Sequence, residues 1–226
     1  DVVAQVATQS TFGGAISFPA NRWADVTSYE EALARWESED QIRILFEDGA
    51  APGLPTGLPV ASWEESSDVW PIPSTEPTRM WFTADGRLVD APDDDAGLGV
   101  QFRPDPAESQ TSFYQSGGIW QRTQAFNWQT QDAGENVRFQ TAPLADDMVL
   151  AGTASVDVWL RSDATEAEVE AVLSEVRPDG REMRVQAGQL QVSYRALDAS
   201  STDLKPVQKG YEDGHAPLVP GEWPQV

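Results

Sequence analysis

Proline spacing is the feature that most constrains the fold of this chain. Between Gly49 and Pro77 the prolines recur at short intervals, at Pro52, Pro55, Pro59, Pro71, Pro73 and Pro77. Because proline lacks a backbone N–H and its ring blocks the preceding helical turn, these positions are expected to interrupt every ladder or helix. The chain is therefore predicted to divide into residues 1–48, a Pro-rich linker or crossing at 49–77, and residues 78–226.

The first part ends in a predicted helix and strand. Ser28 followed by Glu31 has the form of a capping box, which marks the start of a helix. The apolar run Gln41–Glu47 stops at the turn pair Asp48-Gly49, a pattern typical of a buried strand. A helix and one strand form an α/β element too small to bury a core alone, so we expect it to pack on a domain outside this chain.

Alternation of apolar and polar residues predicts strands in residues 78–226. Asp85-Gly86 separates the runs 79–82 and 87–89 and has the chemistry of a tight hairpin turn. The runs 153–160 and 189–195 alternate strictly, which predicts strands with one buried face. The fold class predicted from these patterns is mainly β.

Residues 168–176 carry two conflicting signals. Val169, Val172, Leu173 and Val176 have the spacing of an amphipathic helix. The following Pro178-Asp179-Gly180 has hairpin-turn chemistry and leads into the apolar run 183–187. We predict that residues 168–176 are a strand paired with residues 183–187, and the resemblance described below decides this choice over a helix.

The residues needed for hydrolytic chemistry are missing from the sequence. A Ser-His-Asp triad needs an imidazole, and His215, the single histidine, lies in a Gly- and Pro-rich stretch typical of a surface loop. Ser116, which precedes two glycines, lacks the glycine two places before it that a nucleophile elbow uses. We predict no catalytic residue in this chain.

Metal and cofactor sites are not predicted either. With no cysteine and one histidine, only oxygen ligands remain, and Asp93–Asp95 and Asp146-Asp147 lack the alternating spacing of a calcium loop. The sequence contains no phosphate-cradling glycine loop. We therefore predict no metal and no cofactor.

The net charge of −22 argues against two classes of partner. So negative a surface repels nucleic acid and anionic membranes, and no apolar run approaches the length of a membrane span. An extracellular, secreted or cell-envelope setting would suit this charge, but so would an ordinary solvated acidic surface. The compartment stays open.

Aromatic residues provide the remaining candidate site. The chain has nine tryptophans, and an aromatic cluster at Phe113, Tyr114, Trp120, Phe126 and Trp128. Such rings could stack on sugars or line an apolar pocket, although a sandwich core accounts for them as well.

Three ordered segments resemble a known family. They are LAGTASV at 150–156, LSEVRPDGR at 173–181 and QAGQLQVSYR at 186–195. Together they resemble the C-terminal domain of X-Pro dipeptidyl-peptidases and cocaine-esterase-like hydrolases. Upstream, SYEEAL at 28–33 and RILFEDG at 43–49 resemble the end of that family's α/β-hydrolase domain, and WPIP at 70–73 resembles the start of its sandwich.

The resemblance implies a jelly-roll (galactose-binding-like) β-sandwich over residues 78–226, preceded by the C-terminal end of an α/β-hydrolase domain at 1–48. It implies hydrolysis of ester or X-Pro peptide bonds through an acyl-serine, with the triad before residue 1. A sandwich loop in related enzymes walls the acyl pocket, and the residues here that match it are Phe113, Tyr114, Trp120 and Trp128.

The partners that the resemblance implies belong to the same gene product: the catalytic domain, and further strands after residue 226. Both ends of the chain are therefore expected to be incomplete. Two rival functions remain open at this point. One is a free-standing Trp-rich carbohydrate-binding sandwich, and the other is an acidic interaction protein without ligand chemistry.

Overall fold

The computed structural model describes residues 2–12, 14–15, 20–46, 60–92, 99–103, 136–180 and 182–226. The chain forms two compact units, each considered by itself below. The first comprises Asp1–Glu76, Phe82–Leu88 and Pro92–Gln140, and the second Pro77–Trp81, Val89–Ala91 and Thr141–Val226. Over the described ranges the strands form three two-stranded sheets, and the helices are short. The predicted mainly β class is confirmed.

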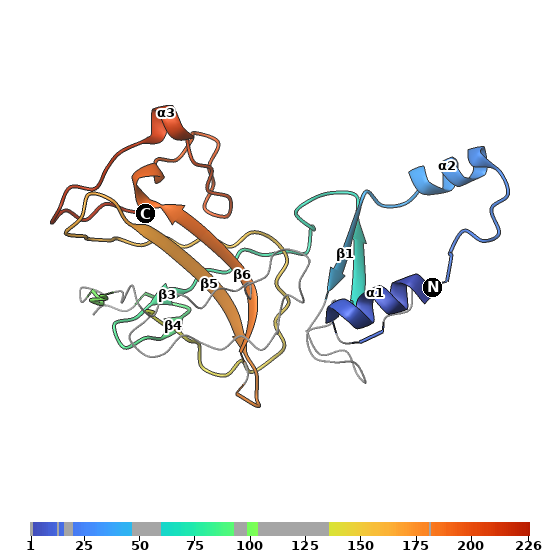
Figure 1. Cartoon of the computed structure of the whole chain (residues 1–226), viewed down its shortest axis with the longest axis horizontal. Coiled ribbons are helices and arrows are strands. Elements are labelled where there is room, and N and C mark those ends of the chain that lie inside the picture. The colour runs from blue at the N-terminus through green and yellow to red at the C-terminus, as the bar shows by residue number, and fades with distance from the viewer. Residues whose placement is uncertain are drawn as a thin grey trace. The chain divides into compact units, whose positions relative to one another are not determined.

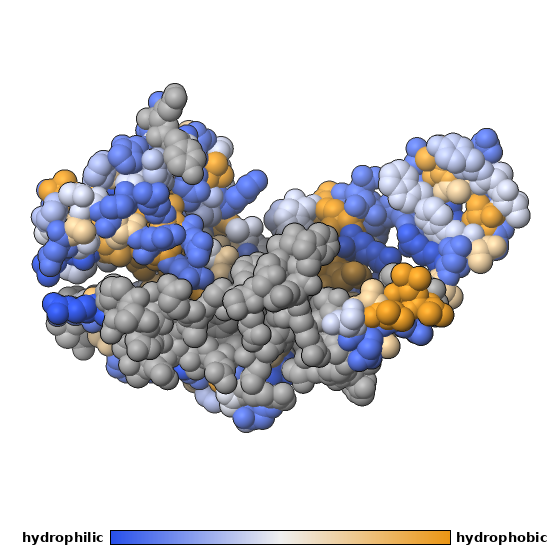
Figure 2. Space-filling view, in the orientation of Figure 1, coloured by the Kyte–Doolittle hydropathy of each residue, from blue (hydrophilic) through white to orange (hydrophobic). Residues whose placement is uncertain are grey.

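Helices α1 (Val2–Phe12) and α2 (Tyr29–Glu37) belong to the first unit. The predicted cap of α2 is confirmed, because the Ser28 hydroxyl accepts a hydrogen bond from the Glu31 backbone N–H at 3.1 Å. On the apolar side of α2, Ala32 and Leu33 are half-buried and Trp36 is 60% exposed. Figure 2 shows apolar surface over α1 as well, where Val3 is 83% exposed.

The β1–β2 hairpin corrects the prediction that proline interrupts every ladder. Strand β1 (Ile42–Phe46) pairs antiparallel with β2 (Trp63–Ser67), from Ile42 opposite Ser67 to Phe46 opposite Trp63. The Phe46 and Trp63 rings stack at 3.9 Å between centroids. Strand β2 fits into the predicted linker because residues 60–70 contain no proline.

The prediction that β1 is buried is also wrong. Its residues alternate between half-buried and exposed, and Leu45 is 59% exposed. The physical reason is that a two-stranded sheet is a single layer and covers neither of its own faces; a second layer must do so.

The hairpin at Asp85-Gly86 is confirmed, with strands of two residues each. Strand β3 (Trp81–Phe82) pairs with β4 (Leu88–Val89). The turn is closed by the Thr83 N–H bonded to the Arg87 carbonyl at 3.0 Å. Gly86 takes a φ of +84°, which glycine adopts without a steric penalty.

The longest strands form the β5–β6 hairpin of the second unit, visible in Figure 1 as two adjacent arrows. Strand β5 (Glu168–Val176) pairs antiparallel with β6 (Glu182–Gln191), and Val172 lies opposite Ala187. The Gly180 N–H bonds the Arg177 carbonyl at 2.8 Å across the turn. The predicted strand and turn are confirmed, and the valines with helical spacing lie in a strand.

The prediction of a strand over 189–195 is wrong beyond Gln191. The chain there enters a 3-10 turn, η1 (Val192–Tyr194), in which Val192 and Ser193 are fully buried. Val192 donates its N–H to the Ala167 carbonyl, and the Ser193 carbonyl accepts from Ala216. Burial of both consecutive residues is incompatible with a strand that turns alternate side chains to solvent.

The predicted strand over 153–160 is also not formed as such. Only Trp159 makes a bridge, antiparallel to Gln225. Val158 and Val226 exchange both of their backbone hydrogen bonds, at 3.0 and 2.8 Å. The predicted inward residue Val156 is 46% exposed. A ladder needs a partner along its whole length, and among the described residues only 224–226 form backbone hydrogen bonds with this run.

The remaining helix is α3 (Tyr211–Gly214). Among the described residues the buried apolar side chains are few: Ala4, Ile72, Met183, Val192 and Leu218. Helices in the described ranges are too short or too polar to cross a membrane.

Candidate functional site

The aromatic residues predicted to line a substrate pocket lie outside the described residues. Phe113, Tyr114, Trp120 and Trp128 all fall within 104–135, and so does Ser116. Their role as a pocket wall stays a prediction. Asp93–Asp95, considered as metal ligands, also lie outside the described part of the chain.

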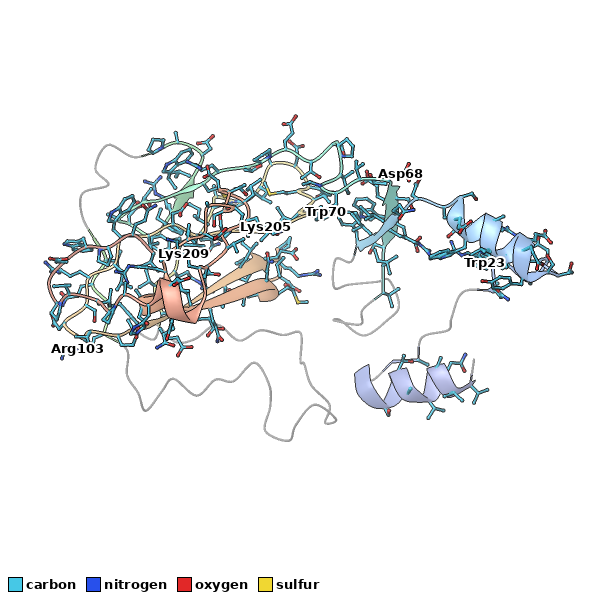
Figure 3. All side chains as sticks on the ribbon, turned by 90° about the horizontal axis from the view of Figure 1, so that it is seen from above. Trp23, Asp68, Trp70, Arg103, Lys205 and Lys209 are labelled. Carbon is cyan, nitrogen blue, oxygen red and sulfur yellow. The ribbon has the colours of Figure 1, made fainter. Side chains whose placement is uncertain are left out.

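A cavity of about 450 Å³ lies where this stretch leaves and rejoins the described chain. Its walls come from the turn Ala84–Gly86 and from residues 100–103 and 136–139. Arg103 is the last described residue before the aromatic stretch and Asn136 the first one after it. The side chain of Arg103 is labelled in Figure 3. The two residues that flank the stretch predicted to face substrate therefore both line the cavity.

Backbone pairing brings these segments together. Arg87 forms a parallel bridge with Gln140, and the Leu88 N–H bonds the Gln140 carbonyl at 2.9 Å. The Phe82 and Phe139 rings pack at 4.3 Å between centroids. A Cβ on Gly86 would lie 3.2 Å from the Arg138 carbonyl oxygen, a tight contact that adds to the preference for glycine at this positive φ.

Asp85 sets the charge at one wall of the cavity. Its carboxylate accepts hydrogen bonds from the Thr83 hydroxyl and from Arg87 Nε, the latter at 2.7 Å. The Thr83 hydroxyl, and after it Arg87, hold the pKa of this carboxyl below its ordinary value. Asp85 is thus occupied by its own turn and remains ionised.

The other walls combine apolar surface with a cation. Val100, Phe102 and Phe139 supply the apolar part, and the exposed Arg103 lies beside them without an ion pair to a described residue. The described lining includes no histidine, serine, lysine or tyrosine. Such walls can hold an apolar group that ends in a hydrogen-bond acceptor, but they offer no nucleophile–base pair for acyl transfer.

His215 is exposed, as predicted for a surface histidine, and its ring packs against that of Tyr194 at 5.0 Å. Asp146 and Asp147 are exposed too. Across the described ranges, acids and histidine form no group of three or more that could hold a metal ion.

Comparison with known families supplies the identification. The sequence profile of the X-Pro dipeptidyl-peptidase C-terminal non-catalytic domain matches residues 34–226, which is most of the chain. The chain belongs to this family. Curated proteins and solved structures give no significant match. The resemblance noted from the three ordered segments is thereby confirmed for X-Pro dipeptidyl-peptidases, and the cocaine-esterase likeness stays a prediction.

Membership of the family carries two consequences. The family's domain is a β-sandwich, in accord with the mainly β structure. A non-catalytic C-terminal domain also implies a catalytic domain in the same polypeptide. The match begins within α2 and includes the β1–β2 hairpin, while the predicted domain boundaries near residues 48 and 77 stay predictions.

Sequence reasoning missed the cavity itself. Arg103 and Asn136 are 33 positions apart in the sequence, and Gly86 lies 17 positions before Arg103. The Asp85-Gly86 turn is the one local signal near the cavity, and its sequence predicts a hairpin but no cavity.

Proposed function

We propose that this chain is the non-catalytic C-terminal part of a serine hydrolase that cleaves ester or X-Pro peptide bonds. In this proposal the acyl-serine chemistry belongs to a triad in the catalytic domain of the same polypeptide, and this chain supports that domain and walls its acyl pocket. The observation that carries the proposal is the family match over residues 34–226.

The cavity supports the walling role. Val100, Phe102 and Phe139 give it an apolar side, and the two residues that flank the stretch containing Phe113 to Trp128 both line it. Pocket walls act on specificity rather than on the chemical step, through contacts worth about 1 to 3 kcal/mol per methylene-sized change. A wall of this kind needs no catalytic side chain of its own.

Exposed apolar side chains support the partner role. Val3, Trp36 and Leu45 are 83%, 60% and 59% exposed in this chain. These side chains lie on α1, α2 and β1, and association with another domain would remove their apolar surface from water. Elements of the first unit are the ones proposed to pack on the catalytic domain.

The first experiment compares the isolated chain with the whole polypeptide on p-nitrophenyl esters and X-Pro p-nitroanilides. We expect no turnover by the chain, and turnover by the whole polypeptide that a serine-directed inhibitor abolishes. His215→Ala in the whole polypeptide should leave kcat unchanged. Inhibitor-sensitive turnover by the pure chain would contradict the proposal.

A second experiment tests the walling role in the whole polypeptide. The quantity to measure is the ratio of kcat/KM for substrates with long and short acyl groups. Trp120→Ala and Trp128→Ala should each change this ratio tenfold or more, because each removes part of the proposed apolar wall. Leu144→Ala is the control, because Leu144 is 54% exposed, and it should leave kcat/KM unchanged for both acyl lengths. Equal loss for every acyl length would place the aromatic residues outside the pocket.

A further inference from the structure

The chain segments around Trp159 and Trp223 form a short antiparallel ribbon with two distinct faces. Trp159 bridges Gln225, and the Leu160 N–H bonds the Pro224 carbonyl at 3.1 Å. Val158, Leu160, Pro224 and Val226 are half-buried, whereas the residues between them are exposed. Because side chains alternate along a strand, the exposed residues share the outward face.

That outward face carries two indoles and three polar side chains. Trp159 is 62% exposed and Trp223 is 51% exposed. The Arg161 guanidinium lies over the Trp223 ring, with Cζ 5.0 Å from the centroid. By the same alternation the exposed Gln225 lies opposite Trp159, and the exposed Asp157 falls on this face two residues before it. We refer to Asp157, Trp159, Arg161, Trp223 and Gln225 as the indole platform.

We infer that the indole platform binds oligosaccharides built of β-linked glucose-type pyranose rings. Rings with equatorial hydroxyls have flat C–H faces, which stack on aromatic side chains, while their hydroxyls lie around the edge of the stack. Arg161 and Gln225 are placed to donate hydrogen bonds to such hydroxyls, and Asp157 to accept them. Asp157 and Gln225 make no hydrogen bond or ion pair to other described residues, and Arg161 contacts the face of the Trp223 ring while its N–H groups form no hydrogen bond to a described residue.

The area of the platform disfavours a protein partner. A whole aromatic side chain presents about 150 to 250 Å². Side chains 62% and 51% exposed therefore offer roughly 250 Å² together. A stable protein interface takes about 800 Å² from each partner. A sugar ring needs no larger surface than this one.

The charge of the chain selects among sugars. At −22 the molecule repels polyanionic glycans at long range, and one arginine does not reverse that field. The ligand class is therefore a neutral glycan. This inference goes beyond the proposed hydrolase role and would hold whichever bond the catalytic domain cleaves.

The test uses cellohexaose as the probe and ¹H–¹⁵N spectra of the 226-residue chain, in which nine indole N–H signals are expected. Two signals should shift on titration, and Trp159→Phe and Trp223→Phe assign them. Trp159→Ala and Trp223→Ala should each weaken binding at least tenfold by calorimetry. Trp159→Phe keeps a ring for stacking and should retain more affinity than Trp159→Ala.

Trp36→Ala is the matched control, because Trp36 is 60% exposed but lies on α2. It should bind cellohexaose as the unmodified chain does. Absence of shifts at the Trp159 and Trp223 indoles at millimolar cellohexaose would overturn the inference. Equal loss of affinity in the control would also overturn it. So would dimerisation of the chain, measured by sedimentation, that Trp159→Ala abolishes.

Discussion

The β5–β6 turn offers the sharpest test of the fold, through two glycine-to-alanine changes in one hairpin. Gly180 has a φ of +80°, and a Cβ added there would meet no heavy atom within 4 Å. The cost of Gly180→Ala is therefore conformational alone. A left-handed backbone costs a residue with a Cβ about 1 to 2 kcal/mol, and the reduced freedom of the unfolded chain returns about 0.4 to 1 kcal/mol. We expect a net destabilisation of about 1 kcal/mol.

Gly188 is the matched control. It lies within β6 opposite Ala171, and a Cβ there would also meet nothing within 4 Å. Its φ is outside the left-handed range, so Gly188→Ala should stabilise the hairpin by about 0.5 to 1 kcal/mol. The same atom is added in both variants, and only the backbone conformation differs. The two free energies should therefore differ by about 1.5 to 2 kcal/mol.

Amide hydrogen exchange of β5 and β6 measures this difference locally, without requiring that the two units unfold together. One kcal/mol corresponds to exchange about fivefold faster. Faster exchange in Gly180→Ala and slower exchange in Gly188→Ala is the expected pair. If Gly180→Ala protects the hairpin as well as Gly188→Ala does, the turn does not have a positive φ at residue 180, and the reasoning is wrong.

Three further outcomes are expected. Leu218→Ala, at a side chain only 3% exposed, should cost about 2 to 5 kcal/mol in urea unfolding, while the neighbouring Val219→Ala, 54% exposed, should cost less than about 0.5 kcal/mol; equal costs would show that Leu218 is not in the core. Ser28→Ala should weaken α2 by about 1 kcal/mol, seen as faster amide exchange in that helix alone. The pKa of Asp85 is lowered in the folded chain, so its stabilisation of the β3–β4 turn should be complete above the ordinary carboxyl pKa and be lost as pH falls through the lower folded value. Thr83→Val should raise this pKa, measured by ¹³C titration of the carboxyl group. An unchanged pKa would contradict the role of the Thr83 hydroxyl.

The hairpins were predictable because their turns are local. Asp85-Gly86 and Asp179-Gly180 each place glycine where the backbone has a positive φ, which is +84° at Gly86 and +80° at Gly180. For residues 168–176 the local turn chemistry and the family resemblance together favoured a strand over the helix that the spacing of the valines indicates. The spacing misled because these side chains are not all on one buried face: Val172 is 38% exposed and Val176 is 44% exposed.

Predictions that depended on segments distant in the sequence were less accurate. The run 153–160 alternates correctly, yet it makes only one bridge, because a ladder forms only where another segment lies beside it. Strand β1 has the composition of a buried strand, but burial needs a covering layer that β2 does not provide. The cavity at Arg103 and Asn136 was not predictable, since it depends on Arg87 pairing with Gln140.

Features set within a few residues could be predicted from the sequence alone: the turns at Asp-Gly, the cap at Ser28, and the ordered segments that identify the family. Tertiary structure alone decided where Val192 and Ser193 leave the strand for a buried turn, and which tryptophans face outward. The physical reason is the range of the forces involved. Backbone sterics and capping hydrogen bonds act between neighbours in the chain, whereas burial and strand pairing depend on segments that only the folded chain brings together.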